Sequence, residues 1–592
     1  MTGRVVGVLP DVPAIDKVFD YSVPPAMDAD VRIGTIVRVV LHGRRVGGWV
    51  VREGASASPD RALRPLAKVT GWGPPPELVD LASWAAWRWA GRRASLLGTA
   101  SPPGAVRGLP PAPSSVSGSG DHNRSTSTLQ RPLPLNERSG EAGELARSAL
   151  ARGGSTLLRI APATDPFPVV SAAAGLGPAL VLCASNADAA HVARRLREAG
   201  HAVALHPREW ATARAGGVSV VGARAAAWAP MPDLAAVVVL EAHDESYQEE
   251  RAPTWHARDV AVERARRAGV PCVVVSPCPD LAMQAEWQGS DTVVASRSAE
   301  RAGWPILDVI DRRADDPRTG LFSDRLADAL RRHERVVCVL NRKGRARLLA
   351  CGACGELARC ETCTAAVAQV EDRLVCHRCA TTRPPVCAAC GAARLKSLKL
   401  GVARVRDELE ALTGRPVGEV TAETDDVPDV PVLVGTEAVL HRAPRPDAVA
   451  FLDFDQELLA TRYRATEQAL ALLARAARLV GGRRAGGRVL VQTRLPKHEV
   501  LDAALHGDPG RLATVERERR EALRFPPFSA LAVVSGPVAP DLVERLDGID
   551  VLGPDDGKWL LRARDSTTLA DALARAGRPP GRLRIEVDPL RV

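Results

Sequence analysis

Long apolar runs are missing from this chain of 592 residues. No stretch reaches the roughly eighteen consecutive apolar residues that predict a membrane-spanning helix. Residues Met1–Pro10 also lack the charged and apolar blocks of a signal peptide. We therefore expect a soluble, cytoplasmic protein with no membrane partner.

Aromatic side chains are scarce as well, with 3 Tyr and 7 Phe in the whole chain. Because alanine, arginine, glycine and proline are abundant, this reads as a general compositional bias, and no function follows from it. Neither charge sign dominates: 79 Lys+Arg against 70 Asp+Glu give a net charge of +9. That mild excess suits a polyanionic partner without requiring one. The length excludes a single core and predicts four or five domains.

Cysteine is the residue with a pattern: eight of the 12 cysteines form four Cys-x-x-Cys pairs. The pairs are Cys351/Cys354, Cys360/Cys363, Cys376/Cys379 and Cys387/Cys390. Each pair places two thiolates on one tight turn, and two such turns complete a tetrahedral zinc site. The cluster therefore predicts two Zn²⁺ ions per chain, and the spacing alone leaves nested and serial pairing of the turns open.

Two other uses of these cysteines are weaker. A disulfide framework is disfavoured because no leader is present and the other cysteines stand singly in apolar surroundings, at Cys183, Cys272, Cys278 and Cys338. An iron–sulfur cluster uses different spacings. His377 lies inside the third pair, but eight thiolates already complete both sites.

The pattern of the chain around the cysteines predicts a multidomain α/β protein. Short β-branched runs predict a β-rich N-terminal domain, which the amphipathic helix expected at Glu77–Trp89 caps. Strand-like runs that alternate with helical patterns predict parallel sheets. We expect the N-terminal domain at 1–105, a disordered linker at 106–140, one lobe at 141–300, a second lobe at 301–350 and 400–494, the cysteine insertion at 351–399 and an α+β C-terminal domain at 495–592.

Several motifs, in the right order, resemble the PriA family of replication-restart helicases, also called primosomal protein N-prime. The matching segments are Phe19–Pro24, Gly34–Val39, His243–Tyr247, Trp255–Asp259, Leu340–Gly344 and Phe525–Phe528. The resemblance covers nearly the whole chain. It implies two RecA-like P-loop lobes, an N-terminal domain that binds DNA 3′ ends, a two-zinc insertion and a C-terminal domain. The family's winged-helix domain is expected to be reduced or absent, in the linker.

The resemblance also implies site residues. It assigns one zinc to Cys351, Cys354, Cys387 and Cys390, and the other to Cys360, Cys363, Cys376 and Cys379. It implies a pocket for a DNA 3′ end made by Phe19, Asp20, Tyr21, Gly34 and Arg64. Aromatic faces stack on bases and glycine permits close approach, although the strand periodicity of Phe19 and Tyr21 equally fits core residues. Basic residues that are candidates for phosphate contacts are Arg44, Arg45, Arg92, Arg93, Arg342, Lys343, Lys396 and Lys399.

The nucleotide motifs of the family are altered in this chain. The segment Ile160–Pro166 puts Asp165 at the position of the phosphate-binding lysine and Pro166 at that of the metal-binding hydroxyl. Leu240 replaces a metal-binding aspartate, and aligning the arginine motif with Arg475–Gly482 puts Leu479 and Gly482 at its arginine positions. We therefore expect degenerate lobes without catalytic or nucleotide-binding residues, no use of ATP, and a pseudo-helicase that is not an enzyme.

These expectations combine into a replication restart protein. It would bind forked and single-stranded DNA at abandoned or stalled forks and promote primosome assembly and reloading of the replicative helicase. Its partners would be other primosome proteins, single-stranded DNA-binding protein and the replicative helicase. An active ATP-dependent 3′-to-5′ DNA helicase is the alternative, and a zinc-ribbon scaffold in transcription or RNA metabolism is a third class.

Overall fold

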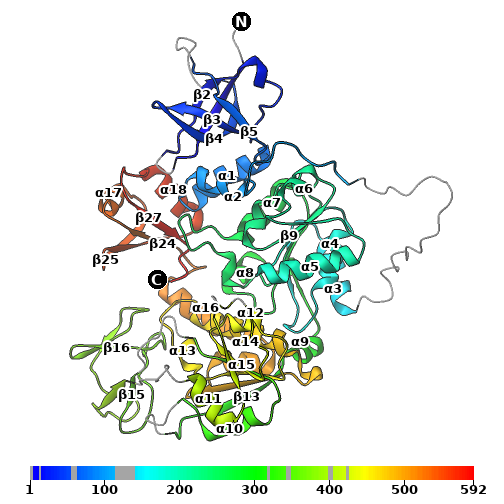
Figure 1. Cartoon of the computed structure of the whole chain (residues 1–592). Helices are drawn as coiled ribbons and strands as arrows, with labels where there is room; N and C mark the ends of the chain where they lie inside the picture. Colours follow the sequence, from blue (N-terminus) through cyan, green and yellow to red (C-terminus); the bar gives the residue numbers. More distant parts are fainter. Residues whose placement is uncertain are drawn as a thin grey trace, which may run out of the picture.

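The computed structural model describes residues 4–12, 15–54, 63–113, 140–315, 321–341, 349–397, 405–421, 424 and 426–591. In this part of the chain it contains six sheets, distributed over lobes that follow one another along the sequence (Figure 1). The predicted multidomain α/β class is confirmed. Arg342, Lys343, Lys399 and residues 114–139 of the expected linker lie outside the described residues.

The N-terminal domain is an antiparallel sheet that closes on itself. Its strands are β1 (Val5–Pro10), β2 (Phe19–Ser22), β3 (Ile36–Leu41), β4 (Arg44–Glu53) and β5 (Lys68–Gly71), in the order β2-β1-β4-β3-β5. Ser22 pairs with Pro65, just before β5, and this closes the sheet. Inward-facing valines such as Val37 and Val39 fill it. Helices α1 (Pro76–Arg88) and α2 (Arg93–Ala100) follow.

Lobe 1 is a seven-stranded parallel sheet with helices packed against it. Its strands run in the order β12-β6-β11-β10-β7-β9-β8. They are β6 (Ser155–Arg159), β7 (Ala179–Leu182), β8 (Val203–Leu205), β9 (Ser219–Gly222), β10 (Ala236–Val239), β11 (Cys272–Val275) and β12 (Thr292–Val294). The helices are α3 (Glu141–Ala151), α4 (Phe167–Ala174), α5 (Asn186–Glu198), α6 (Trp210–Ala215), α7 (Ala257–Ala268), α8 (Leu281–Glu286) and α9 (Arg297–Gly303). The central strands are buried on both faces, which explains their near-continuous apolar sequences.

Lobe 2 is a six-stranded parallel sheet in the order β13-β23-β22-β14-β21-β20. Its strands are β13 (Ile306–Asp311), β14 (Val336–Val339), β20 (Val417–Val420), β21 (Val432–Gly435), β22 (Ala448–Phe451) and β23 (Arg488–Thr493). The helices are α10 (Asp324–Arg331), α11 (Val405–Thr413), α12 (Val439–Arg442), α13 (Asp455–Leu458) and α14 (Ala465–Val480). The cysteine segment lies between β14 and α11, so it is an insertion in this lobe.

The cysteine module has little regular structure. It holds two small antiparallel sheets, one of β15 (Leu349–Cys351) and β19 (Leu395–Ser397), the other of β16 (Ala368–Val370), β17 (Arg373–Val375) and β18 (Thr382–Arg383). Its small core includes cysteine side chains alongside leucine, alanine and valine.

The remaining chain divides between lobe 2 and a C-terminal sheet. Helix α15 (Glu499–His506) and the start of α16 (Gly510–Leu523) share the apolar core of lobe 2, although the sequence expectation assigned them to the C-terminal domain. The antiparallel C-terminal sheet, in the order β25-β26-β24-β27, contains β24 (Ala530–Ser535), β25 (Asp550–Asp555), β26 (Lys558–Ala563) and β27 (Arg584–Val587), with α17 (Ala539–Val543) and α18 (Ser566–Ala576).

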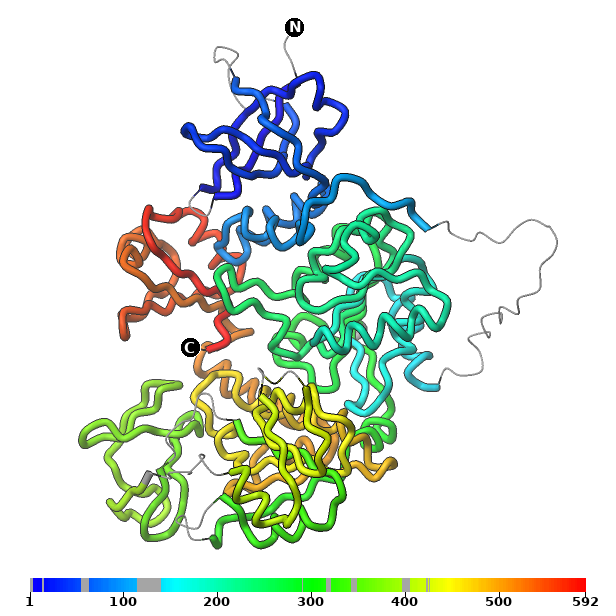
Figure 2. Tube along the Cα trace, in the orientation of Figure 1, coloured from blue at the N-terminus to red at the C-terminus, as the bar shows by residue number. Residues whose placement is uncertain are grey.

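One apolar core joins three parts of the chain that are distant in sequence. It contains residues of α1 and α2, of lobe 1 and of the C-terminal sheet. Polar contacts reinforce it: Arg88 on α1 pairs with Asp588 at 2.7 Å, and Thr254 in lobe 1 donates to the carbonyl of Val587 at 2.7 Å. The C-terminal domain therefore lies against the α1–α2 segment and lobe 1 (Figure 2). Among the described helices, none has both the length and the apolar character needed to cross a membrane.

Candidate functional site

The eight clustered cysteines lie on four turns with one backbone pattern. In each turn the N–H of the first cysteine bonds the carbonyl five residues later, and the N–H four residues later bonds that cysteine's own carbonyl, at 2.8 to 3.0 Å. The residue at this fourth place has a positive φ every time; these residues are Gly355, Thr364, Ala380 and Gly391. The repeated turn gives the Cys-x-x-Cys spacing the same local fold at all four places.

The four turns combine into two groups of four thiols. One group is Cys351, Cys354, Cys387 and Cys390, and the other is Cys360, Cys363, Cys376 and Cys379, with all sulfur atoms of a group within 4.8 Å of one another. The closest sulfur pairs are 3.4 to 3.6 Å apart. Four sulfurs at about 2.3 Å from one zinc ion are about 3.8 Å apart, whereas a disulfide measures about 2.05 Å. The donor set and its spacing fit two metal ions, and the grouping is the one that the family resemblance implies.

Hydrogen bonds favour the thiolate at one position of each group. The N–H of Cys354 lowers the pKa of Cys351 to about 6, with help from the N–H of Ala353. In the other group, the thiol of Cys363 lowers the pKa of Cys376 to about 5, although burial opposes it. Metal ions bind the deprotonated form, so hydrogen bonding favours ligation by one sulfur of each group, while the pKa of Cys354 and of Cys363 is raised by their partner thiols. His377 is exposed, on the turn that carries Cys376.

Arg378 is one of several contacts that attach the cysteine module to lobe 2, because Ala350, Leu357 and Ala366 of the module also belong to the apolar core of that lobe. The guanidinium of Arg378 donates to the carbonyls of Ala460 and Thr461, which follow α13, and to that of Cys363 in the neighbouring turn. The backbone N–H of Ala366 adds a bond of 2.9 Å to the carbonyl of Leu459. The second cysteine group is therefore connected directly to the segment between α13 and α14.

The predicted 3′-end pocket residues on β2 differ in accessibility. Phe19 is half-buried, and the ammonium of Lys17 lies 5.7 Å from its ring centroid. Tyr21 is only 4% exposed, and its hydroxyl donates to the carbonyl of Val40 at 3.2 Å. Asp20 points to the other side of the strand and pairs with Arg52. Phe19 is therefore partly exposed on the face that it shares with Tyr21, Asp20 lies on the opposite face with its side chain 14% exposed, and Tyr21 is a core residue in this conformation.

The other two predicted pocket residues have separate settings. Arg64 is exposed, and its carbonyl accepts from the N–H of Ser22 at 3.0 Å, which places it beside Tyr21 at the closure of the sheet. Gly34 has a φ of +92°, and a Cβ there would lie 1.7 Å from the carbonyl oxygen of Pro74. Gly34 thus has a structural reason to be glycine, at the approach to α1, and the five residues stay a predicted site.

The segment at the phosphate-loop position forms its own ion pair. It connects β6 to α4, and Asp165 accepts from both terminal nitrogens of Arg195 at 2.7 and 2.8 Å. Burial raises the pKa of Asp165, but the bonds from Arg195 and from the N–H of Phe167 outweigh it, so its pKa is lowered. The side chain that stands at the predicted lysine position is an ionised carboxylate held on α5. The expectation that ATP is not used stays a prediction.

The cleft between the lobes is polar and is bridged by arginines from α14. It has a volume of about 570 Å³. Arg478 pairs with Glu241, and Arg475 pairs with Asp244, on the segment that follows β10. Glu241 has a φ of +50°, the left-handed region that non-glycine residues adopt at a cost and often at functional sites. Next to it, burial lowers the pKa of His243 to about 4, and its Nδ1 lies 3.1 Å from the hydroxyl of Ser276.

Arg475 and Arg478 were missed as site residues at the sequence level. The motif alignment placed Leu479 and Gly482 at the arginine positions, yet the helix directs two other arginines, one turn apart, toward lobe 1: Arg475 lines the cleft and Arg478 pairs with Glu241. Their spacing of three residues on an amphipathic helix was the available signal, because residues three apart share a helix face.

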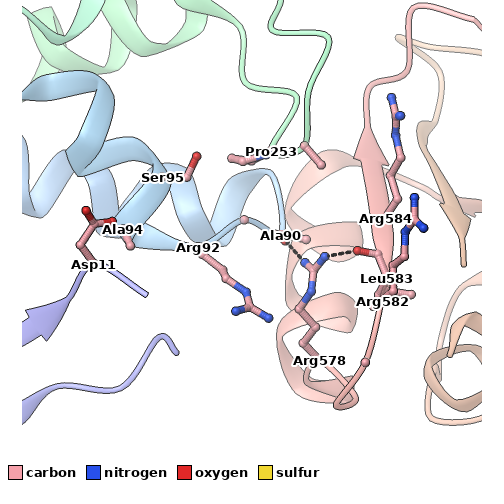
Figure 3. Close-up of a pocket in the computed structure, with 13 residues that line it drawn as sticks. Asp11, Ala90, Arg92, Ala94, Ser95, Pro253, Arg578, Arg582, Leu583 and Arg584 are labelled. Atoms are coloured by element: carbon pink, nitrogen blue, oxygen red, sulfur yellow. Dashed lines mark hydrogen bonds between the residues drawn. The ribbon is translucent and has the colours of Figure 1, made fainter. Parts of the chain in front are cut away.

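A second cationic hollow lies where three parts of the chain meet (Figure 3). This pocket, of about 490 Å³, is lined by four arginines: Arg92 before α2, and Arg578, Arg582 and Arg584 from the C-terminal domain. Arg578 donates to the carbonyls of Ala90 and Leu583 at 3.2 and 2.6 Å, as the dashed lines show. Burial lowers the pKa of Arg578, and the charge of Arg92 lowers it further. The pocket favours an anionic ligand. Only Arg92 among the four was a sequence candidate.

Comparison with known proteins gives a consistent set of relatives. Residues 7–102 match the model of the PriA 3′ DNA-binding domain. Over 92% of the chain and 90% of the relative, the sequence is 29% identical to the probable replication restart protein PriA of Mycobacterium tuberculosis. It is 27% identical to the replication restart protein PriA of Haemophilus influenzae over 58% of the chain and 53% of that protein. A solved structure of the Mycobacterium smegmatis helicase Lhr with single-stranded DNA and AMP-PNP matches with a TM-score of 0.36 and 13% identity, covering 75% of this chain and 60% of Lhr.

These findings correct one prediction. The chain was expected not to be an enzyme, because its nucleotide motifs are altered. Its relative over most of its length is a replication restart protein PriA, and PriA proteins form a helicase family. The comparisons therefore point to a helicase family, and nothing among them or in the described residues shows a non-enzyme.

Proposed function

Because this chain belongs to the PriA family of replication restart proteins, we propose that it binds abandoned or stalled replication forks in the cytoplasm and promotes primosome assembly and reloading of the replicative helicase. The match of residues 7–102 to the PriA 3′ DNA-binding domain carries the proposal. That range covers the closed sheet except for Val5 and Val6 at the start of β1, together with all of α1 and α2. This domain stands at one end of the molecule, where a DNA end can reach it (Figure 1).

Phe19, Asp20, Tyr21, Gly34 and Arg64 recognise the 3′ end in this proposal. The half-buried ring of Phe19 stacks on the terminal base, and Asp20 accepts hydrogen bonds from the base edge or the terminal hydroxyl. Arg64 supplies a positive charge for the neighbouring phosphate. Tyr21 supports Phe19 from the core, and Gly34 keeps the approach to α1 close-packed.

Two zinc ions occupy the cysteine groups in this proposal. The eight sulfurs supply two closed four-thiolate shells, and a closed shell gives structural stability rather than catalysis. Because Arg378 connects the second group to lobe 2, the bound module is presented as a rigid surface. We assign this surface to protein partners of the primosome.

The arginine pocket of Figure 3 is assigned to an acidic partner segment. Four arginines line this open hollow of about 490 Å³, of which Arg584 is paired with Glu586, and its size suits a short peptide segment better than a duplex. Single-stranded DNA-binding protein, the primosome proteins and the replicative helicase are the candidate partners. Asp11 is the carboxylate in the lining.

Competition binding tests the proposal. Labelled forks with a free nascent 3′ end are bound to the protein without nucleotide. Unlabelled forks, with a 3′ end that is either free or blocked, then compete for binding. The free end should compete at least tenfold better, and Phe19→Ala with Asp20→Ala should abolish that preference while zinc content stays unchanged. Phe322→Ala with Asp324→Ala, at the start of α10, is the matched control. Equal competition by free and blocked ends overturns the proposal.

A second candidate is ATP-driven unwinding in the 3′-to-5′ direction. It is favoured by Arg475 and Arg478, which reach across the cleft, and by the strained backbone of Glu241 on the opposite wall. Cationic groups that bridge two lobes are suited to stabilise phosphate charge between them. ATPase activity stimulated by forked DNA, and lost in Arg478→Ala, supports this candidate. Activity that is absent with and without forked DNA rules it out.

A further inference from the structure

The outer face of the N-terminal sheet carries a row of three cations, Lys68, Arg38 and Arg45, which we call the basic row. Arg38 on β3 stands directly opposite Lys68 on β5 and opposite Gly47 on β4. Arg45 is opposite Val40, two places along β3, and is therefore diagonal to Arg38. All three side chains are exposed, whereas their neighbours Val37 and Val39 face the core. Alternation along a strand thus puts the basic row on one surface.

The basic row has no acidic partner within the described residues. Among those residues, none forms a hydrogen bond or ion pair with the side chain of Lys68, Arg38 or Arg45. Like charges directly opposite on a sheet destabilise it, so Arg38 and Lys68 have a cost in the free protein. Asp11 borders the row, because its N–H bonds the carbonyl of Gly47 at 2.8 Å. Gly47 itself adds no side chain, so the face stays flat and open between the cations.

The basic row also continues from a predicted site residue. Arg64 lies four residues before Lys68, in the segment that leads into β5, and is exposed like the row. Four extended residues span about 13 Å along the strand direction, and two strand spacings cover about 10 Å across the sheet. A surface of this length presents cations to several successive phosphates of one nucleic acid strand.

We propose that the basic row binds the phosphate backbone of the DNA that leads away from the 3′ end held at Phe19 and Asp20. The inference rests on the proposed function and extends it by a second contact surface on the same domain. Backbone contacts position a protein on DNA without reading sequence. The basic row therefore supplies salt-dependent affinity, and the pocket supplies preference for the 3′ end. In the competing explanation, Lys68 only prevents the edge strand β5 from pairing with a strand of another molecule.

The test measures how the affinity for forked DNA changes with salt. Affinity falls with salt, and each lost phosphate contact makes the plot of log association constant against log salt concentration shallower by about 0.9 for duplex DNA or about 0.7 for single strands. Arg38→Gln with Lys68→Gln should make the slope shallower by about 1.4 to 1.8. The preference for a free 3′ end should persist. Arg38→Lys should keep the original slope.

The control removes the same charge elsewhere. Arg152→Gln with Arg332→Gln changes two exposed arginines, after α3 and α10, and should leave the slope unchanged. A slope that is equal in the basic-row variant and the control overturns the inference, as does self-association of the basic-row variant with an unchanged slope. If the unaltered protein shows no preference for a free 3′ end, the proposed function is refuted instead. The difference in salt slope between the basic-row variant and the control can still stand.

Discussion

Arg464, at the start of α14 in lobe 2, donates to the carboxylate of Asp280 in lobe 1 at 2.7 Å. Asp280 is 5% exposed, caps α8 through the N–H of Met283 and also faces Arg258 at 3.5 Å. Burial raises the pKa of Asp280, but Arg258 and Arg464 outweigh it, so the pKa is held well below its usual range. This pair is one of the contacts that set how the lobes meet.

Replacing Asp280 should therefore loosen the interface between the lobes. Asp280→Asn keeps the cap on α8 but removes the carboxylate that joins Arg258 to Arg464, leaving each with one other acidic partner, Asp259 and Glu467, a change that costs about 3 kcal/mol. We expect a lower unfolding midpoint and faster proteolysis. The exposed Asp328→Asn on α10 is the control. Because the folded pKa is depressed, the stabilisation by Asp280 is present above its normal pKa and is lost as the pH falls below it. Equal midpoints for both variants contradict this role.

Much of the fold was predictable from local patterns. The alternation of runs such as Ala179–Cys183 and Ala187–Glu198 predicts parallel α/β lobes, because buried strands and amphipathic helices have different periods. The four Cys-x-x-Cys turns were visible because each needs only six neighbouring residues. The place of the cysteines inside lobe 2 followed from strand-like runs on both sides.

The interlobe and interdomain sites were not predictable, because they depend on packing between distant segments. Arg478 meets Glu241 only after α14 has docked against the other lobe. Likewise, Arg92 and Arg578 are far apart in sequence and share a pocket only because the C-terminal domain folds back onto α1 and α2. The burial of Tyr21 depends on closure of the N-terminal sheet, which residue types alone do not specify.

The buried ring of His206 makes stability depend on pH. His206 is 4% exposed, and neither ring nitrogen has a hydrogen-bond partner within the described residues. Burial and the nearby charge of Arg264 lower its pKa to about 4, against about 6.5 in an unfolded chain. Between these values the unfolded chain binds a proton that the folded protein does not, so stability falls as the pH drops.

We expect His206 to contribute about 3 kcal/mol to this loss between pH 6.5 and 4. The side chain introduced in His206→Gln does not bind a proton in this pH interval. The urea unfolding midpoint of this variant should therefore change less with pH than that of the unaltered protein. His191→Gln, at an exposed position on α5, should leave the pH dependence as it was. An identical pH dependence in all three proteins contradicts the assignment.

Arg378 should hold the cysteine module in place without contributing a ligand. Arg378→Ala removes three bonds to carbonyl oxygens, so we expect two metal ions per chain as before but much faster proteolysis near residues 459–463. Elemental analysis gives the metal content, and timed proteolysis measures how readily the segment 459–463 is cleaved. His377→Ala, the exposed neighbour on the same turn, should change neither quantity. Loss of metal in Arg378→Ala would instead mean that the turn does not fold without this side chain.

The arginine pocket should bind acidic peptides through Arg92 and Arg578. Removing two of the four guanidinium groups should weaken binding of an acidic peptide at least tenfold, because each charged hydrogen bond contributes about 1.5 kcal/mol or more. The double variant Arg92→Ala with Arg578→Ala tests this by fluorescence anisotropy. Arg44→Ala with Arg45→Ala, on the far end of the N-terminal sheet, should bind the peptide normally. Unchanged affinity in Arg92→Ala with Arg578→Ala would show that the arginine pocket does not bind an acidic partner.

The grouping of the cysteines can be decided by counting metal ions. In the structure Cys351 and Cys390 belong to one group, with their sulfurs 3.6 Å apart, so Cys351→Ser with Cys390→Ser should destroy a single site and leave one zinc ion per chain. If the turns paired serially, these two cysteines would belong to different sites, and the same variant would lose both ions. Cys351→Ser with Cys360→Ser gives the reverse pattern, because these two cysteines belong to different observed groups but would share one site if the turns paired serially. Zinc content measured on both double variants therefore separates the two arrangements, since only the nested one leaves the first variant with an ion and the second with none.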